Sequence, residues 1–574
     1  MALTKVSGGL LGNLAVGTDN VALGNTALDS LTSGQENVAI GSASLTAVTS
    51  GERNVGVGVS TLQTISTANF NTALGHAAAR DITGSGNTAL GDTAMLTATT
   101  GDNNTAVGHQ SLKANTASNN TAVGKDALIA NTTGTKNIAV GGLSLDANTT
   151  GNNNVAIGYE ALTDNTGGNN VAVGTGALAN NSSASNNTAV GYDAMVANTT
   201  GTQNVAVGAL ALDSCTTGNN NTIVGYNSAS AQTTASAVTA LGASVLGSNT
   251  GNENTAIGAF SMGSNTSGTN NTAVGLSTLA ANTTASYNVA VGNNCLDANT
   301  TGTENVGLGF AALGANTTGS NNVAVGNGAL DANTTSSNNT AVGTLALSAN
   351  TTGTYNTAVG GGAGSSMTTP TYNTVVGYNA GQGTYPLTTG SSCTMVGALA
   401  RPSGTLGNAN SENVFGFNMS ANGGGTTTLG SGGSGLYASH GSNSWTAISD
   451  ERYKKDIVDS EVGLSFINDL RPRNFKWKSC GEVPSDTPRY EEGSNELIHP
   501  NLTGVMHGFI AQEVKAVIDN HPEVPDNQLI WKEDPTGMQG LAEGELVPVL
   551  VKAIQELSAK CDSLQSEINI LKGN

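Results

Sequence analysis

The segment AISDERYKKDI, residues 447–457, concentrates charged side chains after more than four hundred residues that carry few. It contains Ser449 and, five residues later, Lys454, with Lys455 beside it. A serine hydroxyl is a poor nucleophile at neutral pH, and a lysine can activate it where burial lowers the lysine pKa. Serine and lysine stand this close in many proteins by chance, so the spacing alone does not establish a catalytic dyad.

The composition is not that of an ordinary globular protein. The 574 residues include 77 glycines, only 4% aromatic and 10% charged residues, yet 37% hydrophobic residues. Small side chains of this kind can fill an interior when they stack in a regular way, which indicates a repeat. The net charge is −20 and no long run of lysine or arginine occurs, so nucleic acid is not expected as a partner.

The cysteines lie far apart and without metal-ligand spacing, so we expect free thiols in small pockets and neither a zinc site nor disulfides. They are Cys215, Cys295, Cys393, Cys480 and Cys561. The first residues contain no apolar block of signal-peptide length, and the chain contains no run of about 18 apolar residues. We therefore expect no cofactor, no metal and no membrane insertion.

A motif of the form N-[TV]-A-[VIL]-G recurs from Gly24 to Gly397, about every 17 residues and occasionally every 16, in roughly 22 copies. So constant a period indicates one coil of a solenoid per repeat. The motif predicts a short strand that ends in a glycine turn. The A-L-x-A-N-T-T-G part of each repeat predicts a second short strand or extended arm, followed by a turn.

Side chains alternate along a strand, so the alanine should point inward and the fourth-position valine, isoleucine or leucine outward. A long exposed apolar row would aggregate, and we expect self-association, most simply as a parallel trimer. The asparagine that starts each repeat should form an inward ladder and not a cation site. The sequons at Asn131, Asn148 and Asn198 fit turn chemistry better than glycosylation, and the threonine rows leave an ice-binding surface open.

These repeats resemble the head repeats of trimeric autotransporter adhesins over about two thirds of the chain. The resemblance implies a mainly β fold, a long left-handed parallel β-roll or solenoid in a trimer. It says little about activity. The period slips after Gly377, and we place an N-terminal tip at 1–12, the repeat shaft at 13–397 and a Gly/Ser-rich neck at 398–448.

From residue 449 to 574 the composition becomes that of a mixed domain. A helix is predicted up to about Leu470, a strand from Asn474, and a strand followed by an amphipathic helix in GVMHGFIAQEVKAVIDNHPEVP. The segment at about 546–572 has apolar residues at alternating steps of four and three, which predicts a coiled-coil helix. The alternative is an amphipathic helix that lies on its own domain. The predicted trimerisation seam consists of Leu550, Ile554, Leu557, Cys561, Leu564, Ile568 and Leu571.

Four ordered motifs, SDERYKKDI (449–457), LRPRNFKWK (470–478), HGFIAQEV (507–514) and the closing helix, resemble the intramolecular chaperone domain of phage endosialidases and tail fibres, the peptidase S74 family. The resemblance implies a domain that trimerises the chains, helps a β-rich fibre to fold and then cuts itself off at the Ser449–Asp450 junction. Ser449 and Lys454 match the nucleophile and base of that family. Gln512 and Glu513 match its AQEV motif and should cap or orient, and His507 should make a structural hydrogen bond.

We therefore predict a homotrimeric viral fibre or appendage protein, made in the host cytoplasm and located on the virion. Its C-terminal domain would align the three chains and then act once as a self-cleaving serine peptidase. A host-surface receptor or glycan and a virion attachment point are the further partners expected. Two alternatives stay open: an adhesive solenoid with a non-cleaving trimerisation cap, and a threonine-array ice-binding protein.

Overall fold

The structure is a computed structural model, and it describes residues 19–383, 386–403, 410–432, 434–442, 445–447, 451, 454–487, 489–500, 502–525, 530–534 and 537–573. The predicted N-terminal tip at 1–12 lies outside these residues. The chain divides into two compact units, residues 1–448 and 449–574. Each unit is described by itself.

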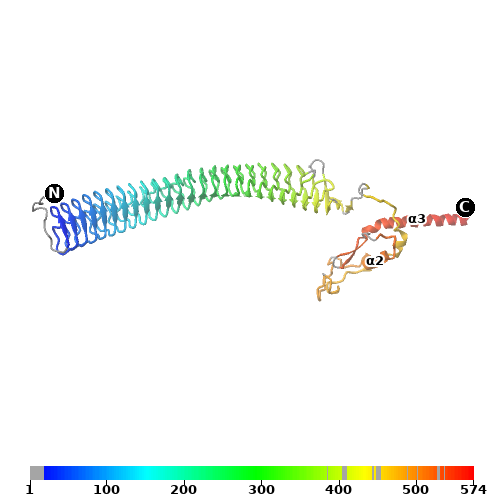
Figure 1. Ribbon diagram of the computed structural model, residues 1–574. Coiled ribbons are helices and arrows are strands. Elements are labelled where there is room, and N and C mark those ends of the chain that lie inside the picture. The colour runs from blue at the N-terminus through cyan, green and yellow to red at the C-terminus, as the bar shows by residue number, and fades with distance from the viewer. Residues whose placement is uncertain are drawn as a thin grey trace, which may run out of the picture. The chain divides into compact units, whose positions relative to one another are not determined.

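The first unit is a stack of short parallel strands, one per repeat, seen as successive coils in Figure 1. Each strand pairs in parallel with the strand of the next repeat, and the same motif position always faces itself, as in Ala189 opposite Ala206. The strands are β1 (Val21–Leu23), β2 (Val38–Ile40), β3 (Val55–Val57), β4 (Thr72–Leu74), β5 (Thr88–Leu90), β6 (Thr105–Val107), β7 (Thr121–Val123), β8 (Ile138–Val140), β9 (Val155–Ile157), β10 (Val171–Val173), β11 (Thr188–Val190), β12 (Val205–Val207), β13 (Thr222–Val224), β14 (Thr239–Leu241), β15 (Thr255–Ile257), β16 (Thr272–Val274), β17 (Val289–Val291), β18 (Val306–Leu308), β19 (Val323–Val325), β20 (Thr340–Val342), β21 (Thr357–Val359), β22 (Thr374–Val376), β23 (Thr394–Val396) and β24 (Asn413–Phe415).

The interior of each coil is narrow and is filled by small residues and asparagines. The middle residue of each strand from β2 to β24 is buried, as the alternation predicts, and a leucine of the following turn packs beside it in many coils, as Ala39 and Leu45 do. The predicted asparagine ladder is confirmed: the backbone N–H and the side-chain amide of Asn54 both donate to Oδ1 of Asn37, at 3.0 and 3.1 Å. The same side-chain amide donates to the carbonyl of Ala68 at 2.9 Å. The ladder therefore satisfies the polar groups that a coil this thin cannot expose to water.

The arm after each strand is a turn, and it is neither the second short strand nor the extended arm that the pattern predicts. In the coil after β2, Ala43 and Leu45 have φ angles of 57° and 53°, so every other residue is left-handed. Backbone bonds still join this arm to the next coil, as from the N–H of Leu45 to the carbonyl of Thr61 at 2.9 Å. Left-handed leucines are costly one by one, and the inter-coil bonds and the buried side chains hold them in place.

The glycine that ends each strand is required by backbone angle and by space. Gly208 has a φ of 134°, and a Cβ at this position would lie 2.5 Å from the carbonyl oxygen of Gly225 in the next coil. A side chain does not fit where two coils approach this closely.

The parallel stack continues beyond Gly397, where the sequence pattern ended. Although the loop before it is longer, β24 pairs in parallel with β23, and β25 (Thr426–Ser431) pairs in parallel with β24. β25 then turns back antiparallel to β26 (Ser434–Ser439), which pairs with β27 (Thr446–Ala447). The longer strands of this hairpin cover the hydrogen-bonding edge of the last coil.

The second unit is a small α+β structure around one apolar core. Its elements are α1 (Leu464–Asp469), β28 (Arg473–Phe475), β29 (Met506–Gly508), α2 (Ala511–Asp519), β30 (Trp531–Glu533), β31 (Gln539–Leu541), the 3-10 helix η2 (Glu543–Glu545) and α3 (Leu546–Leu571). Phe466 of α1 packs with Val514 of α2 and with Leu546 and Val549 of α3 in the core. The predicted parallel solenoid of about 17-residue repeats, followed by an α+β unit that ends in a helix, is confirmed. The left-handed coil and the trimer stay predictions.

Candidate functional site

Two of the four C-terminal motifs meet where β28 lies beside the start of α2. β28 and β29 are antiparallel, with Asn474 opposite His507. Arg473 of β28 donates to both carboxylate oxygens of Glu513 on α2, from Nε at 2.8 Å and from Nη2 at 2.5 Å. The hydrogen bonds from Arg473 lower the pKa of the Glu513 carboxyl. This two-bond ion pair, the Arg473–Glu513 fork, fixes α2 against β28.

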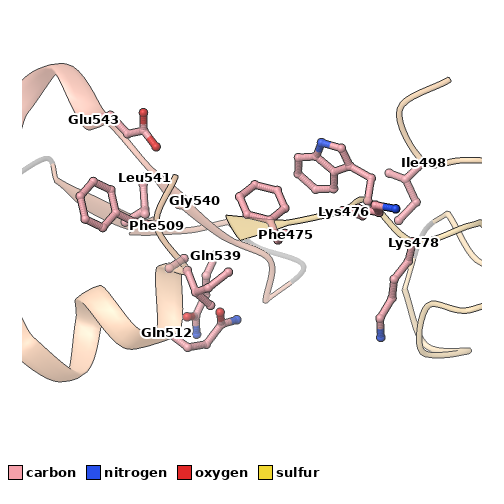
Figure 2. Close-up of a pocket in the computed structure, with 13 residues that line it drawn as sticks. Phe475, Lys476, Lys478, Ile498, Phe509, Gln512, Gln539, Gly540, Leu541 and Glu543 are labelled. Atoms are coloured by element: carbon pink, nitrogen blue, oxygen red, sulfur yellow. The ribbon is translucent and has the colours of Figure 1, made fainter. Parts of the chain in front are cut away.

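Gln512 lines an open hollow of about 540 Å³ beside this fork. In Figure 2, Phe475 stands in the middle of the hollow, and the side chains of Gln512 and Gln539 lie close together on one side of it. His507 is exposed and does not line the hollow. The structure thus separates His507 from Gln512, although both belong to one sequence motif.

The residues of the proposed dyad are only partly described. Ser449 and Asp450 lie outside the described residues. The Lys454 side chain is exposed, and the Lys454 backbone N–H donates to the carbonyl of Glu451 at 2.9 Å. Lysine serves as a base where burial disfavours its charged form, and a single copy of this unit does not bury the Lys454 side chain.

A buried histidine outside the four motifs ties α1 to the end of α2. Nδ1 of His521 lies 2.6 Å from Oε1 of Glu523, and Nε2 lies 2.9 Å from Oδ2 of Asp469, the last residue of α1. The His521 ring also packs edge-on against Phe466 with 5.4 Å between the ring centres. Sequence patterns carry no signal for this contact, because Asp469 lies 52 residues before His521.

The His521 cluster predicts that the second unit is more stable in mild acid. The hydrogen bonds to Glu523 and Asp469 raise the pKa of His521 above its ordinary value. Because the folded pKa is the higher one, this stabilisation is fully present below the unfolded pKa of about 6.5 and is lost as pH rises through the folded pKa. Thermal unfolding of the full chain, followed by tryptophan fluorescence, to which Trp477 and Trp531 of this unit and Trp445 contribute, should give a midpoint for this unit a few degrees higher at mildly acidic than at mildly alkaline pH.

The control for this prediction compares two histidines of one unit. His521→Gln should flatten the pH dependence of the unfolding midpoint, whereas His507→Gln should preserve it because His507 is exposed. An unchanged pH profile in His521→Gln would contradict the assignment.

The C-terminal helix α3 presents two different surfaces. Leu546, Val549 and Ala553 are buried against their own unit. The residues of the predicted seam are exposed instead, from 41% for Ile568 to 85% for Leu571. Figure 1 shows the end of α3 extending away from the rest of its unit. The alternative of a helix lying on its own domain therefore describes the first turns of α3 and not the seam.

The shaft carries a second apolar surface, partly exposed, that runs from β1 to β24. The residue that ends each strand is valine, isoleucine, leucine or phenylalanine in all 24 strands from β1 to β24. Many are exposed, among them Leu74 at 46% and Leu241 at 48%. A row this long is unusual for an isolated soluble chain.

The asparagine and threonine rows of the shaft make contacts between coils. The sequon residues Asn131, Asn148 and Asn198 are buried, and the Asn148 amide donates to Oδ1 of Asn131 at 2.8 Å. The hydroxyl of Thr132 donates to the carbonyl of Thr149 in the next coil at 2.9 Å. These groups serve the stack, which is why the asparagine and threonine rows recur.

The cysteines are free thiols in the structure, but they do not all fill pockets. Cys215, Cys295 and Cys393 are buried in the shaft, where burial raises the pKa of Cys295 to about 12 and that of Cys393 to about 11. Cys480 is half-buried and Cys561 is exposed on α3, so the expectation of small pockets is wrong for Cys561.

The family comparison locates its match in the second unit. Residues 449–522 match the family model Peptidase_S74, described as chaperone of endosialidase. Searches of curated proteins and of solved structures gave no match. Among the described residues, no helix is long and apolar enough to cross a membrane, and no three His, Cys, Asp or Glu side chains are grouped to hold a metal ion. The chain thus combines a β-solenoid shaft with a C-terminal segment, residues 449–522, that is similar to the Peptidase_S74 family of endosialidase chaperones.

Proposed function

We propose that this chain is a trimeric viral fibre or appendage protein whose C-terminal unit aligns three chains and then releases itself at the Ser449–Asp450 bond. The observation that carries the proposal is the exposed apolar seam of α3 in a unit that matches the endosialidase chaperone family. A helix with such a seam is stable in water when copies pack seam to seam. A host-surface receptor or glycan and an attachment point on the virion are the proposed partners of the assembled fibre.

The regularity of the shaft supports the proposal that a separate unit aligns the chains. Neighbouring coils pair identical positions, so Ala172 faces Ala156 on one side and Ala189 on the other. If three shafts packed together one coil out of register, nearly the same residues would meet and the local cost would be small. A C-terminal unit that joins the three chain ends first would set the register before the shafts associate.

The proposed release is hydrolysis of one peptide bond. Neutral Lys454 would take the proton of the Ser449 hydroxyl, whose oxygen would attack the carbonyl carbon of the scissile bond. The Asp450 amine would leave with that proton, and one water would hydrolyse the resulting ester, which leaves a carboxylate on Ser449 and an amino group on Asp450. Because Lys454 is exposed in one chain, we infer that a neighbouring copy buries it. Cleavage would then follow assembly, and the cut would leave the fibre trapped by its own unfolding barrier.

Intact-mass analysis of the purified full chain tests the release. The unaltered protein should yield a large fragment that ends at Ser449, while Ser449→Ala and Lys454→Ala should stay whole. Lys455→Ala is the matched control, since this neighbouring lysine does not fall on the family motif, and it should still be cut. If the unaltered protein also stays whole, the unit is at most a trimerisation cap on an adhesive solenoid.

A further inference from the structure

Three tyrosines form a regular row on one corner of the shaft. Tyr159, Tyr192 and Tyr226 each follow the glycine that ends a strand, after β9, β11 and β13, and are 52%, 57% and 61% exposed. Each is therefore two coils from the next. At the usual spacing of 4.7–4.9 Å between paired strands, neighbouring tyrosines stand about 9–10 Å apart.

The backbone fixes this row rigidly. The carbonyl of Tyr159 accepts from the N–H of Gly176 at 3.0 Å, and the carbonyl of Tyr192 accepts from Leu210 at 2.9 Å. The intervening coils carry Thr175 and Ala209 at the same position, bonded onward to the N–H groups of Asp193 and Asn227 at 3.0 Å each. Small residues thus alternate with rings, and they leave space between the rings.

Each tyrosine is followed in the sequence by a polar residue. Glu160, Asp193 and Asn227 directly follow the three tyrosines. Hydrogen bonding to Glu160 and Asp193 raises the pKa of the Tyr159 and Tyr192 hydroxyls. An aromatic face with a carboxylate or amide at its edge suits a sugar ring, whose C–H face packs on the aromatic ring and whose hydroxyls donate to the oxygen.

The charge around the row selects a neutral ligand. No lysine, arginine or histidine occurs between Lys136 and Arg401, whereas acids stand beside two of the three tyrosines. Lys125 lies two coils before Tyr159 at the same position of the repeat and acts on the Tyr159 hydroxyl, but it is already paired with Asp126 at 2.5 Å. Phosphate-bearing and carboxylate-bearing polymers, nucleic acid included, would therefore meet repulsion from the acids beside the tyrosines. An extended neutral polysaccharide would meet no such repulsion. The length of two of its pyranose rings is similar to the rise over two coils.

We propose that Tyr159, Tyr192 and Tyr226 form a linear binding surface for an extended neutral polysaccharide, with one sugar ring on each tyrosine. The three equal contacts act together, so the affinity for a long chain exceeds that of any single contact. This proposal specifies the glycan partner of the proposed function and rests on that part of it. It does not depend on self-release. Binding and cleavage are measured separately, so either can fail while the other holds.

Affinity electrophoresis of the full chain in gels with soluble neutral polysaccharides (dextran, galactomannan, mixed-linkage β-glucan) tests the proposal, with polygalacturonate as the anionic comparison. At least one neutral polymer should retard the protein, and polygalacturonate should not. Tyr192→Ala should weaken binding roughly tenfold, and alanine at all three positions should abolish it. Tyr192→Phe should bind nearly as well, because it keeps the ring.

The matched control is another pair of exposed aromatic residues on the shaft. Tyr355 and Tyr372 stack on each other at 5.1 Å between centres with a 3° angle between their planes, so each covers a face of the other. Tyr355→Ala should leave binding unchanged. The proposal is overturned if no neutral polymer retards the protein, if the triple variant binds as before, or if that variant changes the oligomeric state, which would place the row between copies.

Discussion

Replacing Leu557 and Leu564 by aspartate should convert the assembled protein into single chains and leave the Ser449–Asp450 bond uncut. Both leucines lie on the exposed seam of α3, at 51% and 57% exposure in the single chain. A leucine that is buried between helices contributes about 2–5 kcal/mol, and each replacement removes three of them from a trimer and adds three charges. Light scattering after size exclusion gives the assembly state, and intact mass gives the cut.

The control for the seam adds the same charges to the opposite face of the helix. Ala559→Asp and Ser566→Asp lie on α3 away from the seam and are exposed, so the doubly substituted protein should assemble and cut normally. Uncut single chains in the seam variant would show that release depends on assembly. This result is expected if a neighbouring copy has to bury Lys454. A seam variant that assembles and cuts normally would refute the role of α3.

Asn204→Ala should open the shaft locally around β12. The Asn204 backbone N–H donates to Oδ1 of Asn187 at 2.9 Å, its side-chain amide donates to the carbonyl of Gly218 at 2.8 Å, and its Oδ1 accepts from the N–H of Asn221 at 3.0 Å. Alanine leaves the Gly218 carbonyl and the Asn221 N–H buried without these partners, at a cost of about 2–4 kcal/mol.

Hydrogen exchange by mass spectrometry is the suitable measurement, because a solenoid of repeats opens coil by coil and not as one unit. Amides of the coils that contain residues 204–221 should exchange on the order of a hundredfold faster than in the unaltered protein. Val205→Thr is the control, since other coils carry threonine at this exposed position, and its exchange should stay near that of the unaltered chain. Equal exchange in both variants would mean that the ladder contributes little.

Much of the shaft follows directly from the sequence period. In-register parallel pairing needs coils of equal length, so a repeat near 17 residues predicts the stack, and the alternation of the strand predicts the inward alanine. The prediction of a second strand or extended arm was wrong because strand patterns do not reveal left-handed backbone at Leu45 and its equivalents. That conformation is stabilised by bonds from the neighbouring coils, which local preferences do not contain.

In the C-terminal unit, too, some features could be predicted from the sequence and others could not. The helix and strand segments and the motifs with Ser449, Lys454, Gln512 and Glu513 were readable as local patterns, because periodicity and residue order act over short stretches. The bond from His521 to Asp469, the fork from Arg473 to Glu513, and the separation of His507 from the hollow were decided by tertiary structure alone. These contacts join residues 40 and 52 positions apart, and their energy exists only after the chain has closed those loops and packed its core.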